Sequence, residues 1–67
     1  MDNRISDERR AAGLTQQELA ERLGVSRQTI ISLENGRYNP SLLLARKLAV
    51  CFGKQIEDIF VFEEDEG

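Results

Sequence analysis

A chain of 67 residues with a net charge of −3 has room for one domain with a small core, which gains stability from dimerisation. It contains no histidine, no glycine-rich phosphate loop and no metal-ligand cluster, which argues against an enzyme, a cofactor or a metal site. The charged start, the lack of an apolar run near about 18 residues and the single cysteine predict a cytoplasmic protein with no membrane contact.

We predict an all-α fold of five helices. The first covers residues 3–12 and ends at Gly13. Ile5 and Ala12 are seven residues apart, so they lie on one face of this helix, with Arg9 between them. We expect that face to pack on the rest of the domain.

The second and third helices form a helix-turn-helix unit over residues 16–35. Thr15 caps the second helix, because a glutamate three residues later completes a capping box. Gly24 ends it, since glycine takes the left-handed conformation at little cost. Ser26 then caps the third helix, whose apolar face at Ile30 is expected to pack on the second.

The opposite face of the third helix suits the reading of DNA bases. The first turn of such a helix reaches base edges, where arginine matches guanine and glutamine matches adenine. Serine accepts several bases, and an exposed isoleucine can contact a thymine methyl. We therefore predict that Arg27, Gln28 and Ser32 read bases, with Thr29 and Ile31 as helpers. A solvated surface is the alternative, but two caps and a glycine turn at this spacing favour DNA.

Residues around this helix are candidates for phosphate contacts. Backbone N–H groups and the helix dipole favour an anion at Gln16, whereas Gln17 either joins that contact or faces solvent. Arg37 follows an Asn-Gly turn and is expected to bind phosphate with the asparagines on either side of it. Tyr38 either binds phosphate through its hydroxyl or packs across the loop. The predicted DNA contacts are Gln16, Gln17, Ser26, Arg27, Gln28, Thr29, Ile31, Ser32, Asn35, Arg37 and Asn39.

A fourth helix is predicted after Ser41, running to about Phe52, and a short fifth helix over residues 55–60. The fourth has a core stripe at helical spacing and is also apolar on a second side, at Leu43. A second apolar side indicates a second buried surface, which we assign to a partner subunit.

The residues that follow have the composition of a β-strand, being aromatic and β-branched. A lone strand needs a partner, so we predict that it pairs with its own copy across a two-fold axis. Phe60, Val61 and Phe62 would then join Leu43 in a dimer interface. The alternative is that the two phenylalanines close the base of the helical core.

We interpret residues 1–62 as the domain and residues 63–67 as an acidic tail. Four of the 12 acids lie in the tail, which leaves nine cations against eight acids in the domain. A body this close to neutral releases few counterions, so non-specific DNA binding is expected to be weak. The tail is expected to be a solvating end, with repulsion of non-operator DNA as the alternative.

The stretch LTQQELAERLGVSRQTIISLENGRYNPS is similar to the helix-turn-helix of the phage Cro/repressor family. Its T-Q-x-E-L-A opening, G-V-S-R turn and L-E-N-G close are rarely found together elsewhere. The resemblance covers nearly all of the chain and is greatest to small stand-alone prokaryotic regulators. It implies a five-helix, lambda-repressor-like domain, usually dimeric, that binds an operator and regulates transcription.

The resemblance also implies roles for single residues. An arginine at the place of Arg9 pairs in the family with a glutamate at the place of Glu34, beneath the recognition helix. The family places its phosphate-binding glutamine at Gln16. This chain departs from many relatives at Glu8, where they have leucine, and at Leu43, where they have a charge.

Three functions remain open from the sequence. The leading one is a homodimeric, sequence-specific regulator, in particular a repressor, that binds a palindromic operator in double-stranded DNA. The second is the antitoxin of a toxin pair, which binds DNA and a protein partner. The third is a protein-interaction module that has lost DNA binding, as the acidic composition would allow.

Overall fold

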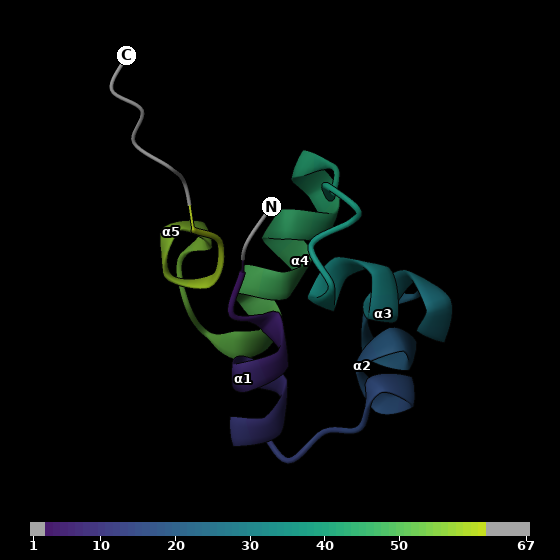
Figure 1. The fold of residues 1–67 in the computed structure, drawn as a ribbon. Helices are drawn as coiled ribbons and strands as arrows, with labels where there is room; N and C mark the ends of the chain where they lie inside the picture. Colours follow the sequence, from purple (N-terminus) through teal and green to yellow (C-terminus); the bar gives the residue numbers. More distant parts are fainter. Residues whose placement is uncertain (1–2, 62–67) are drawn as a thin grey trace.

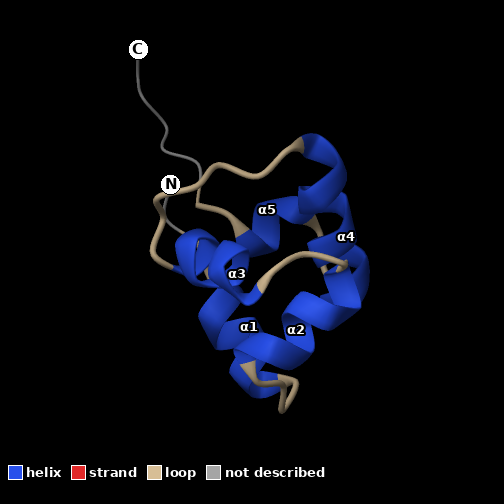
Figure 2. Ribbon diagram, turned by 90° about the vertical axis from the view of Figure 1, so that its right-hand side faces the viewer, coloured by secondary structure: helices blue, strands red, loops and turns tan. Residues whose placement is uncertain are grey.

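The structure is a computed structural model that describes residues 3–61, which form five helices (Figure 1). The predicted all-α fold is therefore confirmed. Helices α2 and α3 pack together, α1 packs on α3, and α4 lies at one edge of the domain beside α2 and α5 (Figure 2). No helix in this part of the chain has the length and apolar character to cross a membrane. The helices are α1 Ile5–Ala11, α2 Gln16–Leu23, α3 Arg27–Glu34, α4 Leu42–Phe52 and α5 Ile56–Ile59.

Local signals place the ends of α2, α3 and α4 as the sequence predicted. The hydroxyl of Thr15 accepts the backbone N–H of Glu18 at 3.0 Å, and the Glu18 carboxylate accepts the N–H of Thr15 at 2.8 Å. Ser26 and Ser41 cap α3 and α4 with their hydroxyls. Gly24 ends α2 at a φ of 74°, where any Cβ would be strained. These caps satisfy N–H groups that a helix leaves unpaired.

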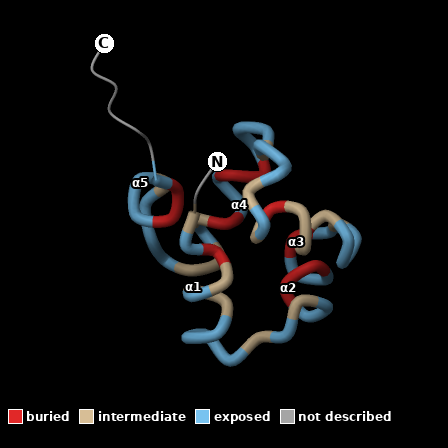
Figure 3. Tube along the Cα trace, viewed as in Figure 1, coloured by how far each residue is buried: buried red, intermediate tan, exposed pale blue. Residues whose placement is uncertain are grey.

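One apolar core holds the five helices together (Figure 3). Its fully buried side chains come from every helix, so no helix is attached by loops alone. The third helix contributes two of them, which fixes its inner face against the domain. The largest fully buried side chains are Ile5, Leu19, Ile30, Leu33, Leu48 and Ile59.

Helix α1 is shorter than the predicted span of residues 3–12. The side-chain oxygen of Asn3 accepts the N–H of Ile5 at 3.0 Å, and its nitrogen donates to the carbonyl of Leu33 at 2.7 Å. Asn3 therefore precedes the helix and ties the N-terminus to α3. At the other end, Ala12 lies beyond the last turn and is exposed, so it does not share the packed face of Ile5.

Phe60 has its partners within its own chain, where the sequence predicted pairing with a second subunit. Its backbone forms an antiparallel bridge with Asn3 of the same chain, and its side chain is buried in the core. Phe60 thus closes the base of the helical core, which was the alternative. Val61 is exposed and has no regular structure, and Phe62 lies outside the described residues. Leu43, also assigned to the dimer interface, is exposed on α4.

Candidate nucleic-acid interface

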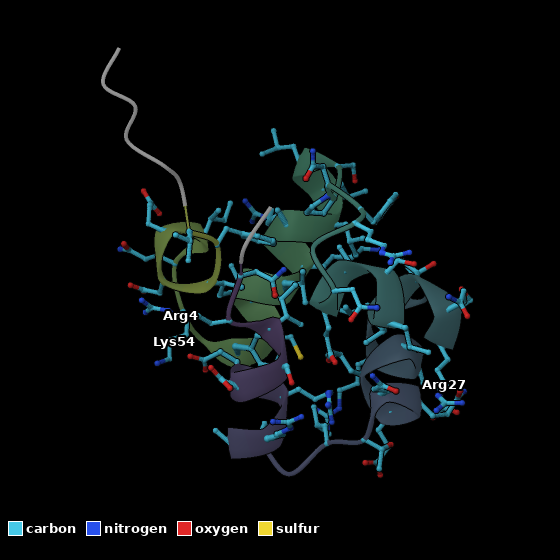
Figure 4. The ribbon with its side chains drawn as sticks, in the orientation of Figure 1. Arg4, Arg27 and Lys54 are labelled. Carbon is cyan, nitrogen blue, oxygen red and sulfur yellow. The ribbon has the colours of Figure 1, made fainter. Side chains whose placement is uncertain are left out.

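The outer face of α3 presents the side chains that the sequence predicted to read bases. Arg27 and Gln28 are exposed in its first turn, and Ile31 and Ser32 are half-buried one turn later. The opposite face is anchored by the fully buried Ile30, so this outer row has a fixed orientation. Arg27 lies on the side of the molecule opposite α5 (Figure 4). A donor-rich helix face of this kind fits a DNA groove.

A shallow recess of about 630 Å³ lies where α2 and α3 begin. It places the exposed guanidinium of Arg27 near the first turn of α2, where Thr15 caps the N–H of Glu18 while the N–H groups of Gln16 and Gln17 come before the first hydrogen bond inside the helix. Backbone N–H groups at the start of a helix suit an oxyanion such as phosphate. Thr15 also lines this recess, although the sequence identified it only as a cap. The lining residues are Arg9, Thr15, Gln16, Gln17 and Arg27.

The carboxylate of Glu34 connects the end of α3 to the two preceding helices. Arg9 donates to it from Nε at 2.7 Å and from Nη2 at 3.5 Å. The same guanidinium donates to the carbonyl of Leu14 at 2.9 Å. The ion pair that the family resemblance implied is therefore present. Both side chains are nearly buried, and the pair ties the end of α3 to α1.

Two glutamines at the start of α2 make different contacts. Gln16 donates from Nε2 to Glu34 Oε1 at 3.1 Å, so one of its two side-chain N–H groups is already engaged. The second N–H and the backbone are what Gln16 has to offer a phosphate. Gln17 donates to Glu21 Oε2 at 3.2 Å along the exposed side of α2. The side chain of Gln17 is therefore held by its own helix. It is exposed to solvent, which was one of the two possibilities that the sequence left open.

A second recess lies along the first turns of α3 and brings Tyr38 beside the predicted base-reading residues. It is lined by Gln28, Ser32 and Tyr38, together with the capping pair Ser26 and Thr29. The Ser26 hydroxyl lies 2.9 Å from that of Thr29 and accepts the Thr29 N–H at 3.1 Å. These two hydroxyls therefore have partners within the protein. Tyr38 is exposed and lines the same recess, although the predicted set of DNA contacts did not include it.

The loop after α3 exposes the remaining predicted phosphate contacts. Asn35, Arg37 and Asn39 are all exposed. The N–H of Arg37 donates to the carbonyl of Ser32 at 3.1 Å, which holds the loop against α3. Only Gly36 has a positive φ, of 75°, whereas Asn35 stays right-handed. The loop backbone is thus fixed while its polar side chains point outward.

The basic residues do not all gather around α3. Arg4 and Lys54 lie on the side of the molecule away from Arg27 (Figure 4), and Lys54 forms an ion pair with Glu8 at 3.5 Å. The charge of Arg9 is balanced by Glu34. Fewer uncompensated cations near α3 mean a smaller counterion release on DNA binding.

Sequence comparisons find close relatives along the whole chain. The helix-turn-helix family model matches residues 5–59. An uncharacterized HTH-type transcriptional regulator of Methanocaldococcus jannaschii is 56% identical over 66 residues, which cover 98% of this chain and 100% of that protein. One of Methanothermobacter thermautotrophicus is 60% identical over 62 residues, covering 91% and 90%. A Bacillus subtilis protein of the same description is 43% identical over 65 residues, covering 97% and 98%.

A solved structure shares the fold. The crystal structure of a transcriptional regulator from Listeria innocua matches 100% of this chain with a TM-score of 0.76 and 18% sequence identity. This chain spans 66% of that protein, slightly under two thirds of its length. At this identity the likeness concerns the arrangement of helices alone.

Proposed function

Because the chain belongs to the Cro/repressor-type helix-turn-helix family, we propose that it is a sequence-specific DNA-binding regulator of transcription. The family is one of DNA-binding domains and is not an enzyme class. The observation that carries the proposal is the outer face of α3, where Arg27 and Gln28 are exposed beside Ser32 while the inner face is locked in the core. In this proposal α3 enters the major groove.

The chemistry of each side chain indicates whether it contacts bases or phosphates. Arg27 and Gln28 are proposed to bind base edges, because each can form a bidentate pair there. The recess at the start of α2 is proposed to hold a phosphate, with Gln16 as a donor. Arg37 and the asparagines beside it are proposed to hold a second stretch of backbone. Phosphate contacts of this kind set the register in which bases are read.

The regulator is proposed to act as a homodimer and as a repressor. Two copies related by a two-fold axis would place two α3 helices in successive major grooves, roughly 34–36 Å apart. The operator would therefore be an inverted repeat with half-sites one helical turn apart. A dimer bound over promoter DNA would exclude polymerase from it, and dimerisation would also stabilise a domain of this size.

Selection from a pool of randomised DNA duplexes at moderate salt tests the proposal directly. The purified protein is expected to enrich one inverted repeat with half-sites about one turn apart. The variant Gln28→Ala should enrich a relaxed sequence at one position in each half-site. If the wild-type protein enriched no sequence at all, the proposed function would be wrong, and a protein that co-purifies with it would be the expected partner.

Replacing Arg27 with alanine should lower operator affinity by roughly 1–3 kcal/mol and relax specificity at one base pair. Replacing Arg37 provides the matched control, because both arginines are exposed but only Arg27 lies on α3. Arg37→Ala should weaken binding to all sequences evenly and flatten the salt dependence. Fluorescence anisotropy with operator and scrambled duplexes, at several salt concentrations, separates the two effects. An even loss for Arg27→Ala would make it a phosphate contact.

A further inference from the structure

An apolar groove with a basic rim runs between the end of α2 and the outer side of α4. Leu43 and Val50 are 62% and 70% exposed, although they are large aliphatic residues, and Leu42 beside them is 80% exposed. The groove has a volume of about 520 Å³. It lies apart from the α3 surface proposed to bind DNA. Its lining residues are Arg22, Leu23, Leu43, Arg46, Lys47, Val50 and Cys51.

The charges around this groove select its occupant. Three lining residues, Arg22, Arg46 and Lys47, are cationic, and no acidic residue of the described chain lines the groove. Helix α4 itself contains no acid. Two such faces packed directly against each other across a two-fold axis would bring like charges together. An occupant must therefore supply both apolar surface and negative charge.

Residues 62–67 of this chain have that composition. Their sequence is Phe-Glu-Glu-Asp-Glu-Gly, one aromatic residue followed by four acids. We propose that residues 62–67 of one subunit bind the α2–α4 groove of a second copy, and that the exchange is reciprocal. Phe62 covers Leu43 and Val50, and the acids pair with the three cations of the rim. This inference rests on the homodimer of the proposed function and assigns its contacts.

The position of α5 favours a second copy over the same chain. Helix α5, which leads to Val61, and α2 lie on different sides of α4 (Figure 1). Phe62 follows Val61 directly and extends only about 3.5 Å beyond it. An α-helix with its side chains is about 10–12 Å across, so the short segment after Val61 favours the groove of a second copy over that of its own subunit. A second subunit can present its tail there without that restriction.

The contact predicts a dimer that is sensitive to salt. Exposed ion pairs are individually weak and are screened by added salt. Several such pairs form in each of the two symmetric contacts. We therefore expect added salt to raise the dimer dissociation constant about 10- to 100-fold. The apolar contact of Phe62 is insensitive to screening, so Phe62→Ala should weaken the dimer at every salt concentration.

Charge exchange between two full-length variants tests the proposal. One carries Arg46→Glu and Lys47→Glu in the groove. The other carries Glu63→Lys, Glu64→Lys, Asp65→Lys and Glu66→Lys in the tail. Each variant alone should be monomeric, because its groove and tail have like charges.

An equimolar mixture should form a heterodimer, measured by sedimentation equilibrium and identified by native mass spectrometry. Arg10→Glu, an exposed change on α1, should leave the wild-type dimer intact.

Three outcomes would overturn the proposal. Dimers that persist in each variant alone would show that groove and tail are not the interface. A mixture that stays monomeric would show that charge pairing between groove and tail does not hold the dimer, and would leave the basic groove to an acidic partner of another kind. A wild-type protein that is monomeric at every concentration would remove the dimer altogether. DNA selection is a separate readout, so an enriched operator in the first two cases would leave the proposed DNA-binding function standing.

Discussion

Replacing Arg9 with alanine is expected to lower the free energy of unfolding by about 3–5 kcal/mol, because it leaves a nearly buried carboxylate without its cation. The side chains of Arg9 and Glu34 are 12% and 8% exposed, and their closest N–O distance is 2.7 Å. The substitution also removes the donor to the Leu14 carbonyl. A domain of this size has a total stability of roughly 3–10 kcal/mol. Urea denaturation followed by circular dichroism should therefore show at least about a third of it lost.

The neighbouring residue provides the control for this prediction. Arg10 is exposed on the same helix, so Arg10→Ala should change stability by less than about 0.5 kcal/mol. The double variant Arg9→Met with Glu34→Gln should recover much of the loss, since neither buried charge remains. Equal stabilities for Arg9→Ala and Arg10→Ala would falsify the structural role given to the ion pair. DNA affinity measured well below the melting temperature would then also be unchanged.

Replacing Ile30 with alanine should cost about 2–5 kcal/mol, because it removes a fully buried side chain from the inner face of α3. The adjacent Ile31 faces the other way and is half-buried. Ile31→Ala should cost less than about 1 kcal/mol in stability but weaken operator binding roughly tenfold, through loss of apolar contact with the DNA. Thermal denaturation and anisotropy titrations on both variants check the contrast.

The opposite pattern would contradict this account of α3. A stable Ile30→Ala variant would mean that the inner face of α3 is not held by the core. An Ile31→Ala variant with unchanged affinity would leave Ile31 as a packing residue with no contact to bases. Low temperature and excess protein keep the folded fraction high enough for the DNA measurement on both variants.

The middle of the fold was predictable from sequence because its signals are local. The capping box of Thr15 and Glu18, the cap at Ser41 and the glycine after α2 each act within a few residues. Helical spacing likewise identified Ile30 as a core residue. The Arg9–Glu34 pair was different, because it spans 25 positions and came from the family resemblance. The residues next to Arg9 in the sequence do not indicate that its partner lies 25 positions away.

The errors lie where distant parts of the chain meet. Phe60 has the composition of a strand, and only the folded chain shows that Asn3 is its partner. The same asparagine precedes the first helix through a local bond to Ile5, but its second bond, to Leu33, is one that no local pattern near residue 3 indicates. In the candidate site, the bond of Gln16 to Glu34 and the place of Tyr38 depend on how the helices pack. Side-chain partners across helices are set by tertiary geometry.

The bridge between Asn3 and Phe60 also sets an order of events during synthesis. Ribosomes make the N-terminus first, so Asn3 must wait for nearly the whole domain before its partner exists. The backbone N–H of Arg4 then donates to the carbonyl of Ile59, next to the bridge between Asn3 and Phe60. Contacts of such long sequence separation form late, because loop closure must come before them. A nascent chain therefore joins Asn3 and Arg4 to the last helix, and closes the base of its core, only after Phe60 has left the ribosome.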